Sequence, residues 1–160
     1  MDQLYIDTAF KTPRLIEKRE MMFGDMSRTG VPFSKDPHVV YHGGRYLMYY
    51  SIPPKKGDEK SGWNIGIVES RDLIDWKQPV DAPILFPQLP WEGECIEGAS
   101  ITIQNNKMYM FYAGAYNNWP QQVGVAVSDN GLTWKRVFDE PFLSPKEWMI
   151  ALESLKYTNV

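Results

Sequence analysis

Two carboxylates stand at matching places, each just before a run of residues with strong strand propensity. Asp36 lies three residues before the run that starts at Val39, and Glu97 lies four residues before the run that starts at Ile101. A pair of converging carboxylates can supply the acid and the base or nucleophile of glycosidic bond cleavage when about 5–9.5 Å separate them. A structural interpretation carries equal weight: Asp36 caps the turn before Pro37, and Glu97 is a solvated loop acid.

The elements that must position these acids occur twice in the chain. A hairpin pattern covers residues 39–51 around Gly43-Gly44 and again residues 101–113 around Asn105-Asn106. Both are β-branched or aromatic runs split by two residues able to adopt positive φ, which is the strongest local hairpin signal. The hairpins are offset by 62 residues.

The repeat continues beyond the hairpins. Each is followed by a glycine-containing strand pattern and by a polar turn that leads to Trp76-Lys77 or Trp134-Lys135, and these parts are offset by 58 residues. The four-residue difference is a longer loop in the first copy, residues 53–62. A weaker fourth strand is expected around residues 77–80 and 135–138. We expect Trp76 and Trp134 to pack between the repeats and each polar turn to bond to its own backbone.

A four-stranded antiparallel unit repeated in tandem predicts an all-β fold built of β-propeller blades. We divide the chain into an N-terminal lead-in or edge strand (1–34), blade one (35–94), blade two (95–145) and a weakly helical C-terminal tail (146–160), which together form one domain. Propellers close with about four to eight blades, so two blades make an incomplete propeller. Because exposed sheet edges are templates for pairing, we predict a homo-oligomer.

The first strand of a propeller blade lines the central channel, and equivalent positions on neighbouring blades face the same end of it. Asp36 and Glu97 are therefore expected at one mouth of the channel as a catalytic pair. Flat apolar rings and planar polar groups from loops on that side are candidates for binding a carbohydrate substrate, with covered blade edges as the equally weighted alternative for the tryptophans. These candidates are His38, Trp63, Asn64, Trp91, Glu94, Tyr116, Asn117 and Trp119.

Composition and charge exclude several classes of protein. The 160 residues carry a net charge of −3, which argues against a nucleic-acid binder, and no apolar run is long enough to cross a membrane. Cys95 is the single cysteine, so no intrachain disulfide is possible and a cytoplasmic location is the default expectation, although a secreted mature form would look the same. The sequence contains neither a Cys/His cluster nor a phosphate loop, so we expect no metal and no cofactor.

Both inner-strand motifs resemble those of a known group of enzymes. Residues 35–51, which begin Lys35-Asp36-Pro37, and residues 97–101 before a tyrosine-rich strand are similar to segments of five-bladed propeller glycoside hydrolases. That group includes arabinanases, β-xylosidases, invertases and levansucrases, and the resemblance covers about residues 34–145. It implies hydrolysis of a small oligosaccharide or glycoside by carboxylate acid/base catalysis.

The resemblance also implies roles for individual acids. Asp36 matches the aspartate that serves as base or nucleophile, and Glu97 matches either the acid or the position that tunes it. Glu94, which precedes Cys95, resembles the Glu-Cys pair of invertases and is the less favoured acid. Members of the group take three acids from three blades, whereas this chain has two inner strands. A non-catalytic carbohydrate-binding or assembly module is therefore the alternative, and a sialidase is a weaker one.

Overall fold

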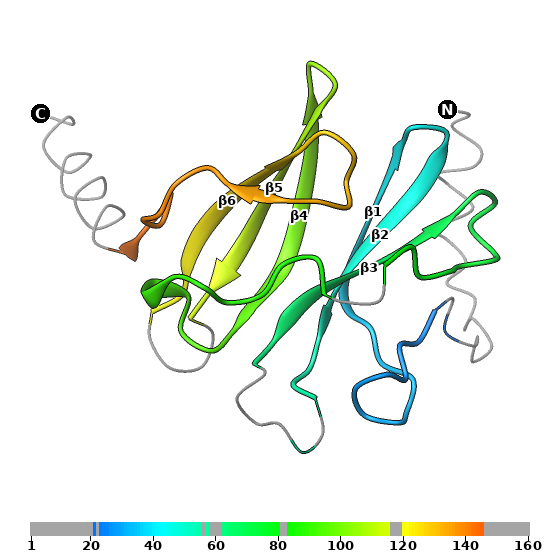
Figure 1. Ribbon diagram of the computed structural model, residues 1–160, viewed down its shortest axis with the longest axis horizontal. Helices are drawn as coiled ribbons and strands as arrows, with labels where there is room; N and C mark the ends of the chain where they lie inside the picture. The colour runs from blue at the N-terminus through cyan, green and yellow to red at the C-terminus, as the bar shows by residue number, and fades with distance from the viewer. Residues whose placement is uncertain are drawn as a thin grey trace, which may run out of the picture.

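The computed structural model describes residues 21, 23–55, 57, 62–80, 83–115 and 120–145. They form two antiparallel sheets that lie side by side (Figure 1). No helix in these ranges is long and apolar enough to span a membrane. The elements, in chain order, are β1 (Lys35–His42), β2 (Arg45–Ile52), β3 (Asn64–Ser70), the short 3-10 helix η2 (Pro90–Glu92), β4 (Ile96–Gln104), β5 (Lys107–Gly114), β6 (Gln122–Ser128) and β7 (Lys135–Arg136).

The sheets follow the predicted repeat, with one difference at the fourth strand. The first sheet has the order β1-β2-β3 and the second the order β4-β5-β6-β7. In the first sheet the expected fourth strand is reduced to an isolated bridge between Glu69 and Lys77. The second sheet has the two-residue β7 in that place. We call the sheets blade one and blade two, because consecutive antiparallel sheets of this kind are propeller blades.

Both hairpins turn where the sequence predicts. Gly43, Gly44, Asn105 and Asn106 all have positive φ, between 50° and 77°. A two-residue turn with both residues in this region twists in the same sense as the strands that it joins, so it fixes the pairing register. The last paired residues before the turns are accordingly His42 with Arg45 and Gln104 with Lys107.

The main hydrophobic core lies between the blades. The second and third strands of blade one contribute Leu47, Tyr49, Ile65 and Ile67, and blade two contributes residues from β4, β5 and β6. Trp134 packs against this core, with its ring 5.7 Å from that of Tyr49, as predicted. Trp76 instead packs on the opposite face of blade one, against the cluster of Met48, Tyr50, Ile52 and Val68, so the prediction that it lies between the blades is wrong.

A tyrosine on each second strand lies over a glycine on the third. Tyr50 pairs with Gly66 and Tyr112 with Gly124, and a Cβ at either glycine would come within 2.7 Å of the tyrosine ring. The tyrosine hydroxyls donate to buried carboxylates that precede each blade. Tyr50 bonds Asp25 at 2.9 Å, and Tyr112 bonds Glu92 at 2.7 Å. The glycine in each third strand is therefore explained by close ring packing.

Candidate functional site

The first strand of each blade begins with the same irregularity. In β1 the pairing shifts between Lys35 and His38, and in β4 it shifts between Glu97 and Ser100. The residue after the first of each pair has positive φ, 51° at Asp36 and 65° at Gly98. Lys35 and Glu97 thus hold equivalent backbone positions, and Asp36 stands where blade two has glycine. The predicted correspondence of the two acids within one residue is confirmed.

Asp36 and Glu97 meet at one ammonium group. Lys35 Nζ lies 2.8 Å from Glu97 Oε2 and 3.5 Å from Asp36 Oδ2. The two carboxylate oxygens are therefore no farther apart than the sum of these distances, which is below the upper limit of about 9.5 Å that glycoside hydrolases use between their carboxyl groups. Two acids from neighbouring blades share one small region, as the repeat predicts.

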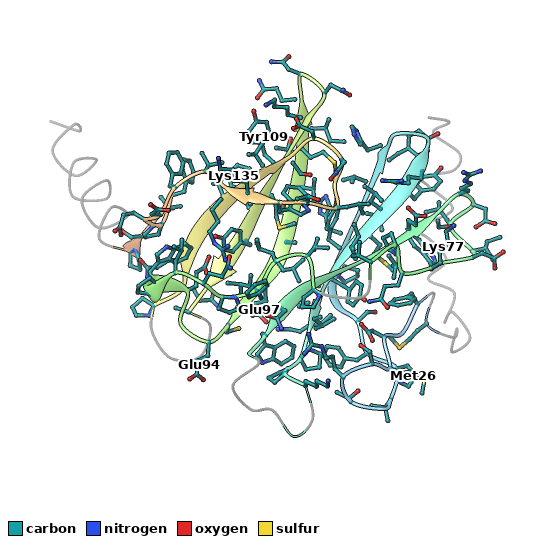
Figure 2. The ribbon with its side chains drawn as sticks, in the orientation of Figure 1. Met26, Lys77, Glu94, Glu97, Tyr109 and Lys135 are labelled. Atoms are coloured by element: carbon teal, nitrogen blue, oxygen red, sulfur yellow. The ribbon has the colours of Figure 1, made fainter. Side chains whose placement is uncertain are left out.

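The two carboxylates differ in exposure and in their other partners. The side chain of Glu97 is 6% exposed, whereas that of Asp36 is 43% exposed. Ser51 links the two segments: its hydroxyl is 3.4 Å from Asp36 Oδ2 and accepts a hydrogen bond of 3.0 Å from the Gly98 amide, next to Glu97 in the chain. Figure 2 shows Glu97 at the start of β4, where the sheets approach each other. Glu97 is thus buried, whereas Asp36 is exposed and accessible to a ligand.

An aromatic ring completes this group of residues. Lys35 Nζ lies 5.2 Å from the centre of the Trp63 ring, and Phe33 packs on the same ring at 5.8 Å. An ammonium within about 6 Å of an indole face is attracted by its π electrons, so Trp63 helps to fix Lys35 between the acids. We call Lys35, Asp36, Ser51, Trp63 and Glu97 the carboxylate site.

The predicted sugar-binding residues lie in several parts of the structure. Trp63 belongs to the carboxylate site and is half-buried, and His38 is a half-buried residue of β1. Asn64 is 2% exposed, and its Nδ2 lies 3.4 Å from the Gly62 carbonyl. Their roles toward a substrate stay predictions. Tyr116, Asn117 and Trp119 lie outside the described residues.

Trp91 and Glu94 lie elsewhere, along a groove of about 670 Å³ beside η2. Other walls of this groove come from Pro120, Glu140 and Pro145. The Trp91 indole donates to the Asp139 carbonyl at 2.9 Å and stacks on Tyr112, so much of its ring is used in packing. Figure 2 places Glu94 in the loop beyond η2, away from Glu97. The groove and the carboxylate site are joined through the backbone, because the Trp63 amide donates to the Glu94 carbonyl at 3.1 Å.

Sequence reasoning did not single out Lys35 or Glu92. Lys35 was visible as a basic residue beside Asp36, but its pairing with Glu97 depends on side-chain contacts across the two blades at equivalent positions of their bulges. Glu92 is completely buried and binds Arg136 through both carboxylate oxygens, at 2.7 and 2.8 Å. Burial opposes the ionised form, but hydrogen bonds from Arg136, from the Leu89 and Gln88 amides and from Tyr112 lower the pKa of Glu92. Every oxygen is engaged, so Glu92 is structural.

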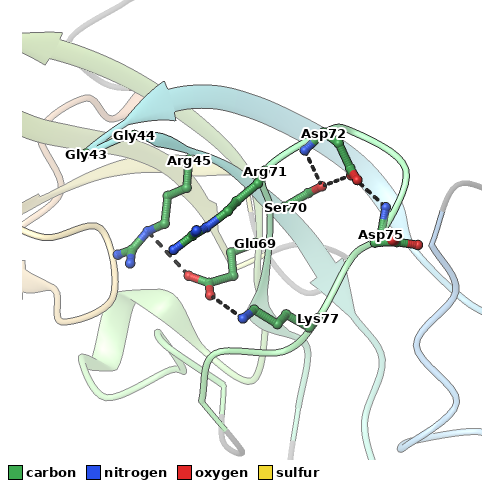
Figure 3. A pocket seen from close by; sticks show the side chains of 9 residues that line it. All are labelled: Gly43, Gly44, Arg45, Glu69, Ser70, Arg71, Asp72, Asp75 and Lys77. Atoms are coloured by element: carbon green, nitrogen blue, oxygen red, sulfur yellow. Dashed lines mark hydrogen bonds and ion pairs between the residues drawn. The ribbon is translucent and has the colours of Figure 1, made fainter.

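A hollow of about 300 Å³ at the other end of blade one is also structural (Figure 3). There Glu69 pairs with Arg45 at 3.3 Å and with Lys77 at 3.5 Å, beside the turn that Ser70 and Asp72 form. A second hollow of about 500 Å³ occupies the equivalent place in blade two, lined by Lys107, Ser128, Asn130 and Lys135. Because the hollow recurs with the repeat, it follows from the blade geometry.

Comparison with known sequences identifies the family. Residues 31–151, about three quarters of the chain, match the family described as "Glycosyl hydrolases family 32 N-terminal domain". The chain belongs to this family. The glycosyl hydrolase family 32 N-terminal domain matched here contains both bulges and both blades, so the predicted relationship to propeller glycoside hydrolases is confirmed.

Individual proteins similar to this family 32 domain share 18–30% sequence identity with it in the three comparisons that follow. It is 30% identical over 117 residues to the beta-1,2-mannobiose phosphorylase of Thermoanaerobacter sp., which covers 64% of the chain and 38% of that protein. Fructan 1-exohydrolase IIa of Cichorium intybus superposes with a TM-score of 0.61 at 24% identity over 73% of the chain and 23% of that protein. A family 117 glycoside hydrolase of Zobellia galactanivorans gives 0.55 at 18% identity over 66% and 32%.

These structures show the fold, and the domain spans well under half the length of each of these relatives. The all-β, propeller-blade assignment is therefore confirmed for a partial propeller.

Proposed function

We propose that this family 32 domain acts on a glycosidic bond, with Asp36 and Glu97 as the carboxylates of the reaction and a small oligosaccharide or glycoside as substrate. The observation that carries the proposal is the convergence of both acids on Lys35 Nζ, at 3.5 and 2.8 Å. Family membership and the phosphorylase and hydrolase relatives support the same class of chemistry.

The contacts favour different roles for the two acids. Asp36 is open enough to reach an anomeric carbon or to activate a nucleophile there. Glu97 is buried and paired with an ammonium, an arrangement suited to a charged group that holds the site and accepts a substrate hydroxyl. Of the two roles that the resemblance leaves for Glu97, we therefore propose the tuning one. The proton donor would then come from outside the carboxylate site.

Amide substitution of each acid tests the assignment. Asp36→Asn should lower turnover of a panel of aryl glycosides by about 10²–10⁴-fold, the usual contribution of an acid/base group, and Glu97→Gln should lower it too, because the charge that holds Lys35 at the site is lost. Asp129→Asn is a matched control, because Asp129 also pairs with a lysine, Lys107 at 3.8 Å, but is 83% exposed. Glu94→Gln tests whether Glu94, in the groove beside η2, contributes to turnover. Unchanged turnover in the first two variants would reject the pair as catalytic.

Sugar binding measured by calorimetry separates the enzyme from the binding module. Binding of oligosaccharides without turnover in the unaltered domain would support the non-catalytic alternative. Binding that is weakened equally by Asp36→Asn and by Trp63→Ala would place the ligand at the carboxylate site.

A second reaction, phosphorolysis, is favoured by one specific observation. An ammonium stands between the two acids, and a relative at 30% identity is a phosphorylase. In that reaction a phosphate oxygen replaces water at the anomeric carbon and yields a sugar phosphate, and Lys35 would offset the phosphate charge. Turnover that requires inorganic phosphate and is lost in Lys35→Met, but retained in Lys35→Arg, would favour phosphorolysis over hydrolysis.

We also propose that the domain associates with further copies of itself. The support is the set of large apolar side chains exposed on both blades, such as Tyr41, Ile103, Phe138 and Phe142. Sedimentation tests this: a monomer at all concentrations would contradict it. A cytoplasmic location stays a prediction.

A further inference from the structure

Two residues of the carboxylate site differ from their counterparts in the repeat. Asp36 stands where blade two has Gly98, and Ser51 stands where blade two has Ala113, both at the offset of 62 residues. The two residues meet in the structure, because the Ser51 hydroxyl lies 3.4 Å from Asp36 Oδ2. Blade two forms the same bulge and the same strand pairing with glycine and alanine, so neither polar side chain is needed for the shape of a blade.

The backbone at Asp36 favours glycine over aspartate. Its φ of 51° lies in the left-handed region, where Gly98 has 65°. A residue with a Cβ reaches this region only at an energetic cost, although aspartate tolerates it better than most residues do. Strained positions of this kind cluster at functional sites. The bulge therefore carries the Asp36 carboxylate at some cost to stability, which agrees with its proposed role.

Ser51 is a buried polar residue in an apolar row. Alternate residues of a strand point to the same side of the sheet, so Ser51 continues the row of Leu47 and Tyr49 that faces blade two. It is completely buried, and a buried hydroxyl costs free energy unless it is hydrogen-bonded. The Ser51 hydroxyl accepts from the Gly98 amide at 3.0 Å and donates its proton toward Asp36 Oδ2. One hydroxyl thus joins the bulge of blade two to the carboxylate of blade one.

We propose that Ser51 is a positioning residue, which sets the orientation of the Asp36 carboxylate for reaction with a glycoside. The inference rests on the proposed function of Asp36. The Gly98 amide fixes the Ser51 hydroxyl, and this hydroxyl in turn holds Oδ2 of Asp36. In the part of the chain that the structure describes, no hydrogen bond reaches Asp36 Oδ1, so that oxygen is the one presented to a substrate.

Lys35 alone does not explain the placement of Asp36. Its Nζ approaches the same oxygen at 3.5 Å but is closer to Glu97, at 2.8 Å. A lysine side chain is flexible, whereas Ser51 is fixed by strand pairing with Lys35 on one side and Ile65 on the other. Both contacts to Asp36 are longer than a tight hydrogen bond, so they orient the carboxylate and leave its charge available to a substrate. Contacts of this length often tighten when a substrate is bound.

The first experiment measures the orientation of Asp36 without turnover. Scalar couplings across the Cα–Cβ bond, measured by NMR in solution, report whether Asp36 holds one rotamer. We expect a single rotamer in the original chain and an average of rotamers in Ser51→Ala. Because alanine is the residue of blade two at this place, the variant should fold. Ala113→Ser is the matched control: it adds a hydroxyl at the equivalent position and should leave the Asp36 rotamer unchanged.

The proposal is overturned if Asp36 already averages its rotamers in the original chain, or if it keeps its rotamer in Ser51→Ala. In the second case, averaging in Lys35→Met would assign the positioning to the ammonium instead. A Ser51→Ala chain that fails to fold would also overturn the proposal, because the hydroxyl would then be required for the fold.

The second experiment measures turnover of the aryl glycosides. Ser51→Ala should lower kcat by about 10–10²-fold with little change in KM, because a misplaced reacting group affects the transition state more than the bound substrate. In an Asp36→Asn background the same substitution should have no further effect, because Ser51 acts through Asp36. Equal fold-losses of kcat in the two backgrounds would show a merely structural role and overturn the proposal.

These measurements separate the inference from the proposed function. Unchanged turnover in Asp36→Asn would reject the proposed function of Asp36, and the rotamer measurement would still decide whether Ser51 orients it. Lowered turnover in Asp36→Asn together with unchanged kcat in Ser51→Ala would reject the positioning role alone.

Discussion

The buried pair of Glu92 and Arg136 shows how much one residue can contribute to this fold. It joins the approach to blade two to the last strand of that blade, and the Arg136 side chain also reaches Gln88 and the Phe86 carbonyl. Removing one partner from a buried pair leaves the other charge uncompensated. The pair is therefore a local determinant of stability and a sensitive place for substitution.

We predict that Glu92→Gln lowers the free energy of unfolding by about 3–5 kcal/mol, the usual effect of breaking a buried ion pair. Urea denaturation measures the change. Glu94→Gln, two residues away and exposed, should change stability by less than about 0.5 kcal/mol. Equal effects of the two substitutions would contradict a structural role for Glu92.

The Glu92 carboxylate also makes the stability of the fold depend on pH in the acid range. The pKa of Glu92 is lower in the folded protein than in the unfolded chain, because its hydrogen bonds outweigh burial. The contribution of Glu92 to the free energy of unfolding is therefore fully present above the pKa of the group in the unfolded chain. It is lost as the pH falls through the pKa of the group in the folded protein. Stability measured against pH should fall less steeply on the acid side in Glu92→Gln than in the original chain.

At the residue scale the sequence predicted some contacts of the site and missed others. Equivalent positions were enough to bring Asp36 and Glu97 together, since a repeat places like residues alike. The link through Lys35 was not predictable, because it depends on how side chains of the two blades meet at their bulges. Trp91 was a sugar-binding candidate with a covered blade edge as the equal alternative. It stacks on Tyr112 and donates to the Asp139 carbonyl, and its role toward a sugar stays a prediction.

The polar turns between the third strand and the tryptophan are the most closely repeated element. The Ser70 hydroxyl accepts from the amides of Asp72 and Leu73, and Ser128 accepts from those of Asn130 and Gly131, at 2.9–3.2 Å. Leu73 and Gly131 both have positive φ, at 66° and 77°. The backbone conformation therefore does not decide which residue stands there.

We predict that Gly131→Ala destabilises the domain by about 2–4 kcal/mol, combining left-handed strain with overpacking. A Cβ at Gly131 would lie 2.6 Å from Leu47 Cδ1 and 2.7 Å from the Tyr49 hydroxyl. Leu73→Ala is the matched control at the same backbone position of blade one, where the side chain is 38% exposed. Thermal unfolding should show a large shift for the first variant and a small one for the second.

Secondary-structure elements were predicted better than residue contacts, because hairpin turns and alternating strands are local signals in the sequence. The glycine and asparagine turns and the offsets of 62 and 58 located both hairpins and the third strands. The fourth strands were harder to predict, since β7 has two residues and its counterpart is a single bridge. Strands so short are determined by pairing with their neighbour and leave little trace in the sequence.

At the scale of the whole molecule, the blades share one core, and their unfolding should be coupled. Leu47 of β2 is fully buried against residues of blade two. Leu47→Ala should lower stability by about 2–5 kcal/mol. Hydrogen exchange should show faster opening of β5 amides in blade two as well as of β2 amides. Faster exchange confined to blade one would mean that the blades are independent units.

One consequence follows from the backbone equivalence of Lys35 and Glu97. If duplication had left both copies identical, this position would place like charges against each other, ammonium facing ammonium or acid facing acid. Because one copy carries a lysine and the other a glutamate, the repulsion becomes an attraction. The neighbouring Asp36 then adds one negative charge that the pair does not neutralise, and this charge is exposed to a ligand. The two equivalent positions thus differ in sign, with the ammonium on blade one and its buried carboxylate partner on blade two.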